Sequence, residues 1–234
     1  MSKLRFALTV ASLVAVMAFQ SQSCADGVHL GNTVMTAAEL VSLERPRVVP
    51  RAEAYLQELP VTVTASRAKR SSGGVHDFYS EGDYWWPDPD NPDGPYIRRD
   101  GLSNPDNFVV HRRAMVRLSS IIGTLTSAWL ITGESRYAEH AGNHLAAWFI
   151  DPATKMNPSL NYGQAIKGKV EGRSIGVIDT IHLVEVARGA QILGERGALP
   201  EAQFEQIKTW FSEYLDWLTT HPFGQRERIH PNNH

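Results

Sequence analysis

Cysteine is nearly absent from this chain. Its 234 residues include one, Cys24, which lies in an N-terminal segment with the features of a secretory signal. Cleavage after Ala25 would leave a chain without cysteine, which excludes disulfides and thiolate metal sites. No HExxH sequence or comparable histidine spacing indicates zinc, so we expect neither a metal nor a cofactor.

Long apolar runs are lacking beyond the first 25 residues. Residues 1–25 are predicted to be a signal peptide, because Lys3 and Arg5 precede an apolar run that ends at Phe19. That run is too short to cross ~30 Å of hydrocarbon, and no later stretch reaches ~18 apolar residues. Acylation of Cys24 is an alternative use of this segment. We expect a periplasmic or secreted protein with no membrane segment after the signal is removed.

An excess of basic charge is also lacking. The formal net charge is −2, and the chain after residue 25 has 21 basic and 25 acidic side chains, a charge of about −4. This balance argues against nucleic acid as a partner. An acidic polymer can still bind where basic residues gather in a cleft, because a cleft concentrates the local electric field.

Strand patterns are nearly absent, whereas helical periodicity is strong after Asn107. Apolar residues recur at three- and four-residue spacing from Phe108 to Leu130, and Thr132-Gly133 ends this run. The same reasoning predicts three further helices, over Ser135–Phe149, roughly Gly172–Leu193, and from Pro200 to about Leu218. Two short helical patterns lie nearer the N-terminus, at Thr36–Leu40 and Arg51–Leu59. We expect two separate helices there, because Pro46 and Pro50 lie between the patterns.

Short turns join the later helices into antiparallel hairpins. Such hairpins in series predict an all-α fold, an α/α toroid (barrel) in which the long loops share one end. Three segments would then surround one cleft: residues 76–105, 151–171 and 221–234. Most of the last segment belongs to a predicted polar loop, Thr219–Pro231. Loops of this length are usually functional.

The first of these loops contains a dense group of aromatic and acidic residues from His76 to Pro87. Tyr84, Trp85 and Trp86 are candidate substrate-binding residues, because aromatic faces stack on sugar rings. The alternative is that the tryptophans anchor the loop on the core, and each could do one of the two. The following segment, Asp88–Gly94, fits a proline-stiffened turn better than a calcium loop.

Two basic groups are candidates for binding an anion. His111 and Arg112 lie in the first turn of a predicted helix, where the helix dipole disfavours cations unless an anionic ligand is present. Arg113 is expected to be a solvated charge. Asn161, Tyr162 and Gln164 precede Arg173, and this mixture suits a uronate, since Arg can hold a carboxylate in a fork. Pairing of Arg173 with Glu171 is the alternative.

Together, His76–Pro95, Asn157–Gln164 with Gly172-Arg173, and the terminal Asn232-Asn233-His234 resemble the alginate lyase family of polysaccharide lyases. The resemblance covers most of residues 76–234 and implies an α/α toroid, β-elimination at a uronic acid, and an acidic polysaccharide as partner. In this family the Asn-Asn-His motif continues into further helices and a catalytic Tyr. We therefore expect residues 26–234 to be the N-terminal part of such a domain, monomeric, and weakly active or inactive alone.

The resemblance also implies catalytic roles. Asn233 would stabilise the developing enolate, and His234 would share in neutralising the carboxylate or act as the base. By composition, Tyr162 is a weaker catalytic substitute. Two rival functions stay open: an α/α-barrel glycoside hydrolase, which needs a pair of carboxylic acids such as Asp77, Glu81 and Asp83 could offer, and a secreted polyuronate-binding protein without catalysis.

Overall fold

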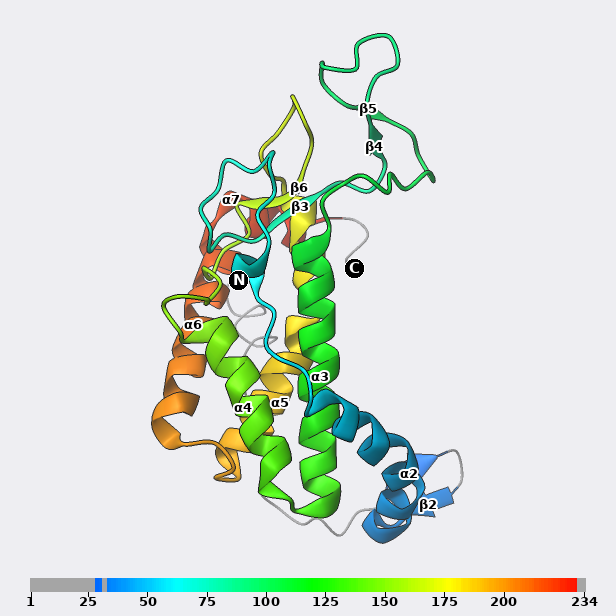
Figure 1. Ribbon diagram of the computed structural model, residues 1–234, viewed down its shortest axis with the longest axis vertical. Coiled ribbons are helices and arrows are strands. Elements are labelled where there is room, and N and C mark those ends of the chain that lie inside the picture. The colour runs from blue at the N-terminus through cyan, green and yellow to red at the C-terminus, as the bar shows by residue number, and fades with distance from the viewer. Residues whose placement is uncertain (1–27, 31–32, 231–234) are drawn as a thin grey trace, which may run out of the picture. The chain divides into compact units, whose positions relative to one another are not determined.

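The computed structural model describes residues 28–30 and 33–230 (Figure 1). The chain divides into two compact units, residues 1–47 and 48–234. In the first unit, strand β1 (Val28–Leu30) pairs antiparallel with β2 (Thr33–Met35). The predicted signal peptide and the Asn-Asn-His motif lie outside the described residues, so the roles of both stay predictions.

Helix α2 (Ala37–Tyr55) is continuous, which corrects the prediction of two short helices separated by prolines. Pro46 and Pro50 are both exposed, and they are four residues apart, so they lie on one solvent-facing side of the helix. The carbonyls that lose a hydrogen bond to each proline can therefore bond to water, which reduces the cost of keeping proline within a helix.

The second unit is mostly helical. Helix α3 (Val110–Thr132) packs against α4 (Ser135–Phe149) and α5 (Leu183–Glu195), and α6 (Glu201–Thr220) packs against α4 and α5. The predicted first, second and fourth helices are confirmed, and α3 ends at Gly133 in the left-handed conformation, φ 73°. The mainly helical class is confirmed. Closure into a toroid stays a prediction.

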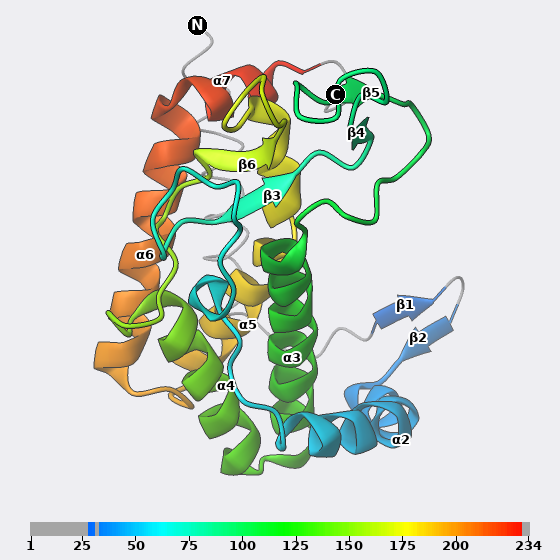
Figure 2. The same cartoon turned by 45° about the horizontal axis from the view of Figure 1, so that its top comes forward.

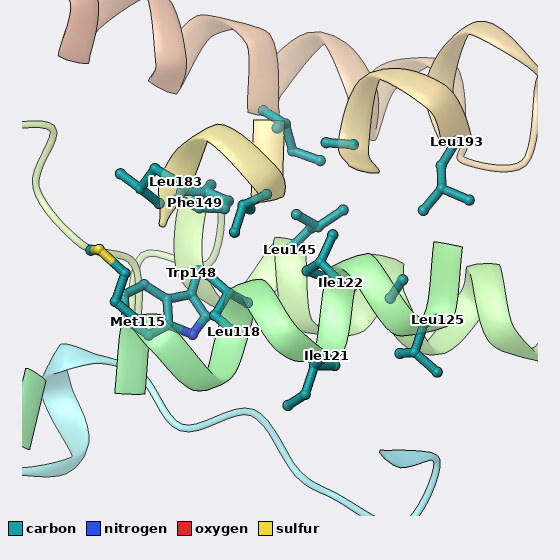
Figure 3. Close-up of a cluster of buried hydrophobic side chains, with 14 of the residues drawn as sticks. Met115, Leu118, Ile121, Ile122, Leu125, Leu145, Trp148, Phe149, Leu183 and Leu193 are labelled. Atoms are coloured by element: carbon teal, nitrogen blue, oxygen red, sulfur yellow. The ribbon is translucent and has the colours of Figure 1, made fainter. Parts of the chain in front are cut away.

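The helices bury a shared apolar core (Figure 3). Met115, Leu118 and Ile122 of α3 face Trp148 of α4 and Leu183 of α5. Each fully buried side chain of this size stabilises the fold by about 1.5–3 kcal/mol. By length and composition α3 is also apolar enough to cross a membrane, a test that buried core helices pass as well. Its packing against α4 and α5 accounts for that apolar character.

Short strands were missed by the all-α prediction. Strand β3 (Tyr79–Glu81) pairs parallel with β6 (Tyr162–Ala165), and β4 (Trp85–Trp86) pairs antiparallel with β5 (Ile97–Arg98). Strands of two to four residues are too short to leave an alternating pattern in the sequence. Figure 2 shows β3 and β6 side by side next to the first turn of α3.

The loop prediction is confirmed in part. The β3–β6 pair joins the long loops 76–105 and 151–171. Within the predicted polar loop the chain forms a helix, α7 (Pro222–Arg228), and α7 packs against the 3-10 helix η2 (Ser174–Thr180). The predicted third helix is therefore two elements, η2 followed by α5. A separate 3-10 turn, η1 (Val63–Ala65), precedes the first long loop.

Candidate functional site

Strands β3 and β6 form a short ribbon in which a register shift separates the Tyr79–Tyr162 pair from the Glu81–Ala165 pair. Gln164 lies within this irregular stretch and adopts a φ of 50°, a left-handed conformation that no other non-glycine residue in the described part of the chain has. For a residue with a Cβ this conformation costs of order 1 kcal/mol and persists only where the surroundings fix it. Such strain and such bulges are often found at functional sites.

Three neighbours fix Gln164. Its backbone N–H donates to Ser80 Oγ at 2.8 Å, and its Nε2 donates to Asp179 Oδ1 at 3.0 Å. Its own carbonyl and Oε1 accept hydrogen bonds from Arg173. Gln164 is buried, so an unpaired polar group of this residue would be costly.

Backbone contact between β6 and η2 brings these groups together. A Cβ added at Gly176 would lie 2.7 Å from the carbonyl carbon of Gly163, so neither position tolerates a side chain without displacement. The close approach carries Asp179, the sixth of the seven residues of η2, to the β3–β6 ribbon. The sequence pattern did not identify Asp179, because a single acidic residue within a predicted amphipathic helix gives no distinct signal.

Asp179 is the buried acceptor of this cluster. Ser80 Oγ donates to its Oδ2 at 2.5 Å, and Arg112 Nη1 lies 3.5 Å from its Oδ1. Arg112 also forms a two-pronged ion pair with Asp83. Burial opposes the charge of Arg112, but hydrogen bonding to Asp83 and the charges of Asp179 and Asp83 outweigh it and raise its pKa. The structure therefore pairs Arg112 with carboxylates of the protein.

Arg173 differs from Arg112 in having no carboxylate partner among the described residues. Its Nε donates to Gln164 O at 2.9 Å and its Nη2 to Gln164 Oε1 at 3.0 Å. The pairing with Glu171 considered from the sequence is absent, since Glu171 accepts a hydrogen bond from Ser72 instead. Burial, with the charge of Arg98, lowers the pKa of Arg173, and the charges of Asp179 and Asp83, which form no ion pair with it, offset this only in part. A partly buried cation with only neutral acceptors is a ready partner for an anion.

Trp85 lies beside this cation. A Cβ added at Gly82 would come 2.6 Å from Arg173 Nη2 and 2.8 Å from Trp85 Cδ1, so the glycine leaves room for the guanidinium and the indole together. Lys169 Nζ is 5.6 Å from the centre of the Trp85 ring, and Arg98 faces Trp85 across the β4–β5 pair. The candidate site is therefore an aromatic ring with three cations around it. Arg98 and Lys169 had not been proposed as site residues.

The other two aromatic candidates have different surroundings. Trp86 donates its indole N–H to Leu102 O at 2.8 Å, and Arg99 lies over its ring, so this side chain anchors the loop that follows β5. Tyr84 is 44% exposed, the most open of the three. One tryptophan thus holds the loop and the other stands at the cationic cluster, as one of the two sequence interpretations allowed.

The remaining predicted site residues lie around the ribbon. His111 is buried: its Nδ1 accepts from the Tyr79 N–H at 3.0 Å, its Nε2 is 2.7 Å from Ser66 O, and burial lowers its pKa. Both ring nitrogens are therefore used within the protein. Asn161 accepts from the Trp217 indole at 3.2 Å. Tyr162 packs beside Tyr79, and its hydroxyl makes no hydrogen bond to a described residue.

Three carboxylates had been considered for a hydrolase. Glu81 is held by Arg70 and the Phe108 N–H, and these outweigh burial and lower its pKa. Asp83 is paired with Arg112, and Asp77 accepts from Gly74 and Asn157. A hydrolase needs one carboxyl kept protonated by a raised pKa, and the lowered pKa of Glu81 argues against that role for this residue. No group of three or more metal-ligating side chains occurs in the described part of the chain.

Comparisons with known proteins identify the family of this chain. A family model described as alginate lyase matches residues 62–234. Among solved structures, the chain is similar to an alginate lyase from Bacteroides ovatus, with 33% identity and a TM-score of 0.72 over 86% of this chain. The chain spans 57% of the length of that structure. No curated protein matches the sequence.

Proposed function

Because this chain belongs to the alginate lyase family, we propose that it binds a uronic-acid-containing polysaccharide and takes part in its cleavage by β-elimination. The observation that carries this proposal is Arg173, a partly buried cation that contacts only the neutral oxygens of Gln164. A uronate carboxylate would form with the guanidinium the ion pair that no described residue of the protein forms with it.

The surroundings of Arg173 suit a sugar acid in particular. The Trp85 ring offers an apolar face to a pyranose, while Lys169 and Arg98 add positive charge at its edges. Such a combination favours a polymer that has both sugar faces and carboxylates. It disfavours a neutral glycan, which would leave Arg173 without a charged partner.

In β-elimination the C5–H and C4–O4 bonds break, a C4=C5 double bond forms, and the departing O4 receives a proton. The C5 proton is a weak acid beside an ionised carboxylate, so neutralising that carboxylate is the main requirement. We assign this neutralisation to Arg173. The amide of Gln164 is already used by Asp179 and Arg173, so Gln164 acts as a positioning residue for the arginine.

Proton transfer is assigned to groups outside this cluster. Asn233 and His234 are proposed to stabilise the enolate and to act as base, as the family resemblance implies. Tyr162, whose hydroxyl is free of described partners, is a further candidate for the proton donor. Both assignments suit an enzyme exported to the periplasm or beyond, where polysaccharides are available.

Incubating the protein with alginate, polyglucuronate and a neutral glucan tests this proposal while near-ultraviolet absorbance and reducing ends are recorded. A lyase gives an absorbing unsaturated product from a polyuronate, whereas a hydrolase gives reducing ends without absorbance. Saturable binding with neither signal would favour the non-catalytic alternative. Arg173→Ala should weaken binding and abolish product, and Lys208→Gln, an exposed cation on α6, serves as the control. Absence of both binding and product with every polyuronate would refute the proposal.

A further inference from the structure

A second basic surface lies at the first turn of α3. It is an open groove of about 430 Å³, here called the α3 groove, with walls formed by cationic, apolar and two acidic residues: Arg67, Ala68, Lys69, Arg70, Glu81, Pro105, Asp106, Asn107, Phe108, Val109, Val110 and Arg113. Four cations thus line the groove against two carboxylates. One of these carboxylates, Glu81, is buried and bonded to Arg70 and to the Phe108 N–H.

Most of the remaining positive charge in this groove is uncompensated. Arg67, Lys69 and Arg113 are exposed and take part in no ion pair with a described residue. Arg113 also lies in the first turn of α3, where the helix dipole disfavours a cation, and the preceding Val109 provides no side-chain cap. Like charges that converge on one groove repel each other, so an anionic ligand would relieve both effects.

Apolar side chains also line the α3 groove. Phe108 is partly buried and packs against the rings of Tyr79 and His111, and Val110 is 39% exposed. Apolar side chains beside exposed cations match a chain of sugar acids, whose rings have apolar faces and whose carboxylates project to the side. A small inorganic anion would contact the cations alone.

The α3 groove is separate from the Trp85 site. Successive side chains of a strand point to opposite faces. Accordingly, Ser80 of β3 bonds to Asp179 on one face, while Tyr79 and Glu81 bond to each other on the other, beside Arg70. The Glu81 N–H also donates to Phe108 O at 2.9 Å, so the segment leading into α3 lies along β3.

We propose that the α3 groove is a second, non-catalytic binding site for an acidic polysaccharide, which holds a part of the polymer away from the reacting sugar. The identity of the ligand as a polyuronate rests on the proposed function. The presence of an anion-binding groove rests only on the exposed cations Arg67, Lys69 and Arg113 and on the apolar side chain of Phe108. The site would raise affinity for long chains, because one polymer can occupy both sites.

Affinity electrophoresis in gels that contain polyglucuronate or alginate tests this inference without requiring turnover. Three variants test the sites: Lys69→Gln/Arg113→Gln in the α3 groove, Arg173→Ala at the Trp85 site, and the combination of all three substitutions. The control, Arg188→Gln/Lys208→Gln, removes the same charge as the groove variant from exposed positions of α5 and α6. Loss of two exposed cation contacts should weaken retardation about five-fold, and the triple variant should not be retarded. The control should migrate like the wild type.

The outcomes distinguish the two proposals. If the groove variant is retarded like the wild type, or if no polyuronate retards any form, the second site is refuted. If the groove variant loses retardation but the wild type yields no unsaturated product, the site stands and the lyase reaction fails. A thermal unfolding curve for each variant establishes that it is folded. If Lys69→Gln/Arg113→Gln is unfolded, Arg67→Gln/Lys69→Gln replaces it, because that variant changes only exposed loop residues.

Discussion

Arg173 donates two hydrogen bonds to one residue, Gln164, through its main-chain carbonyl and its side-chain Oε1, at 2.9 and 3.0 Å. Gln164 in turn is held in a left-handed conformation, φ 50°, by Ser80 and Asp179. The arginine is thus positioned by a strained, neutral residue rather than by a carboxylate. This arrangement leaves its charge for a ligand and explains why the strain is tolerated.

Substitution of Gln164 should separate backbone strain from side-chain bonding. Gln164→Ala keeps the strained conformation and leaves Asp179 and Arg173 each with one partner fewer, so we expect a loss of about 2 kcal/mol in the free energy of unfolding. Gln164→Gly loses the same bonds but relieves the strain, and should be about 1 kcal/mol more stable than the alanine variant. Urea unfolding measures both. Equal stabilities would contradict the role of strain.

Asp179 should be among the more costly positions to neutralise. Asp179→Asn places an amide N–H₂ among the donors of Ser80, Gln164 and Arg112, and should lower the free energy of unfolding by about 3 kcal/mol. Asp100→Asn provides the control, because Asp100 is 66% exposed in its ion pair with Arg98 and its loss should change stability by less than about 0.5 kcal/mol. A loss at position 179 as small as that of the control would show that the buried cluster contributes little.

Arg173 should show opposite effects on stability and on binding. Arg173→Met keeps the volume and removes a partly buried cation without a charged partner, so the unfolding free energy should stay equal or rise. Polyuronate affinity should fall at least about ten-fold, and Arg173→Lys should recover only part of it because it lacks the fork. Calorimetric titration with a polyuronate and urea unfolding give the two quantities. Strong destabilisation by methionine would indicate that the arginine serves the fold instead.

Glu81 should stabilise the protein in a pH-dependent way. Its pKa is lowered because Arg70, the Phe108 N–H and Tyr79 outweigh burial. A carboxyl with a lowered pKa contributes stability that is complete above its unfolded pKa, about 4.3, and is lost as pH falls through the lower folded value. The stability difference between wild type and Glu81→Gln should therefore be constant above about pH 5.5 and shrink below it. A difference that grows on acidification would contradict this assignment.

His144 should give a second pH dependence with a different window. Burial, and then the neighbouring His140, lower the pKa of His144 to about 4. The unfolded chain binds this proton near pH 6.5, so stability should fall by roughly 3 kcal/mol as pH decreases from about 6.5 to 4. His144→Gln, which can still donate to Glu58 O, should remove most of this slope, and His140→Gln should reduce it. Unfolding curves at several pH values would reveal an unchanged slope if the assignment is wrong.

The helices and the aromatic loop could be predicted from the sequence because their signals are local. Apolar residues spaced three and four apart placed α3, α4 and α6, and the aromatic and basic composition of residues 76–105 and 157–173 identified Trp85, Gln164 and Arg173 as candidate site residues. Composition also identified His111 and Arg112, but it could not show that their polar atoms are used within the protein.

The tertiary structure decided what depends on distant contacts. The pairing of β3 with β6 joins residues about eighty positions apart, and the approach of Gly163 to Gly176 brings Asp179 to Gln164. No local pattern encodes these contacts, because the strands are too short to show alternation and a carboxylate in a helical stretch looks like any solvated charge. The sequence by itself determined which segments are helical and which chemical groups are available. Only the packing determined that Arg112 forms ion pairs with carboxylates of the protein whereas Arg173 bonds to the neutral Gln164, since that difference depends on which acceptor each guanidinium can reach.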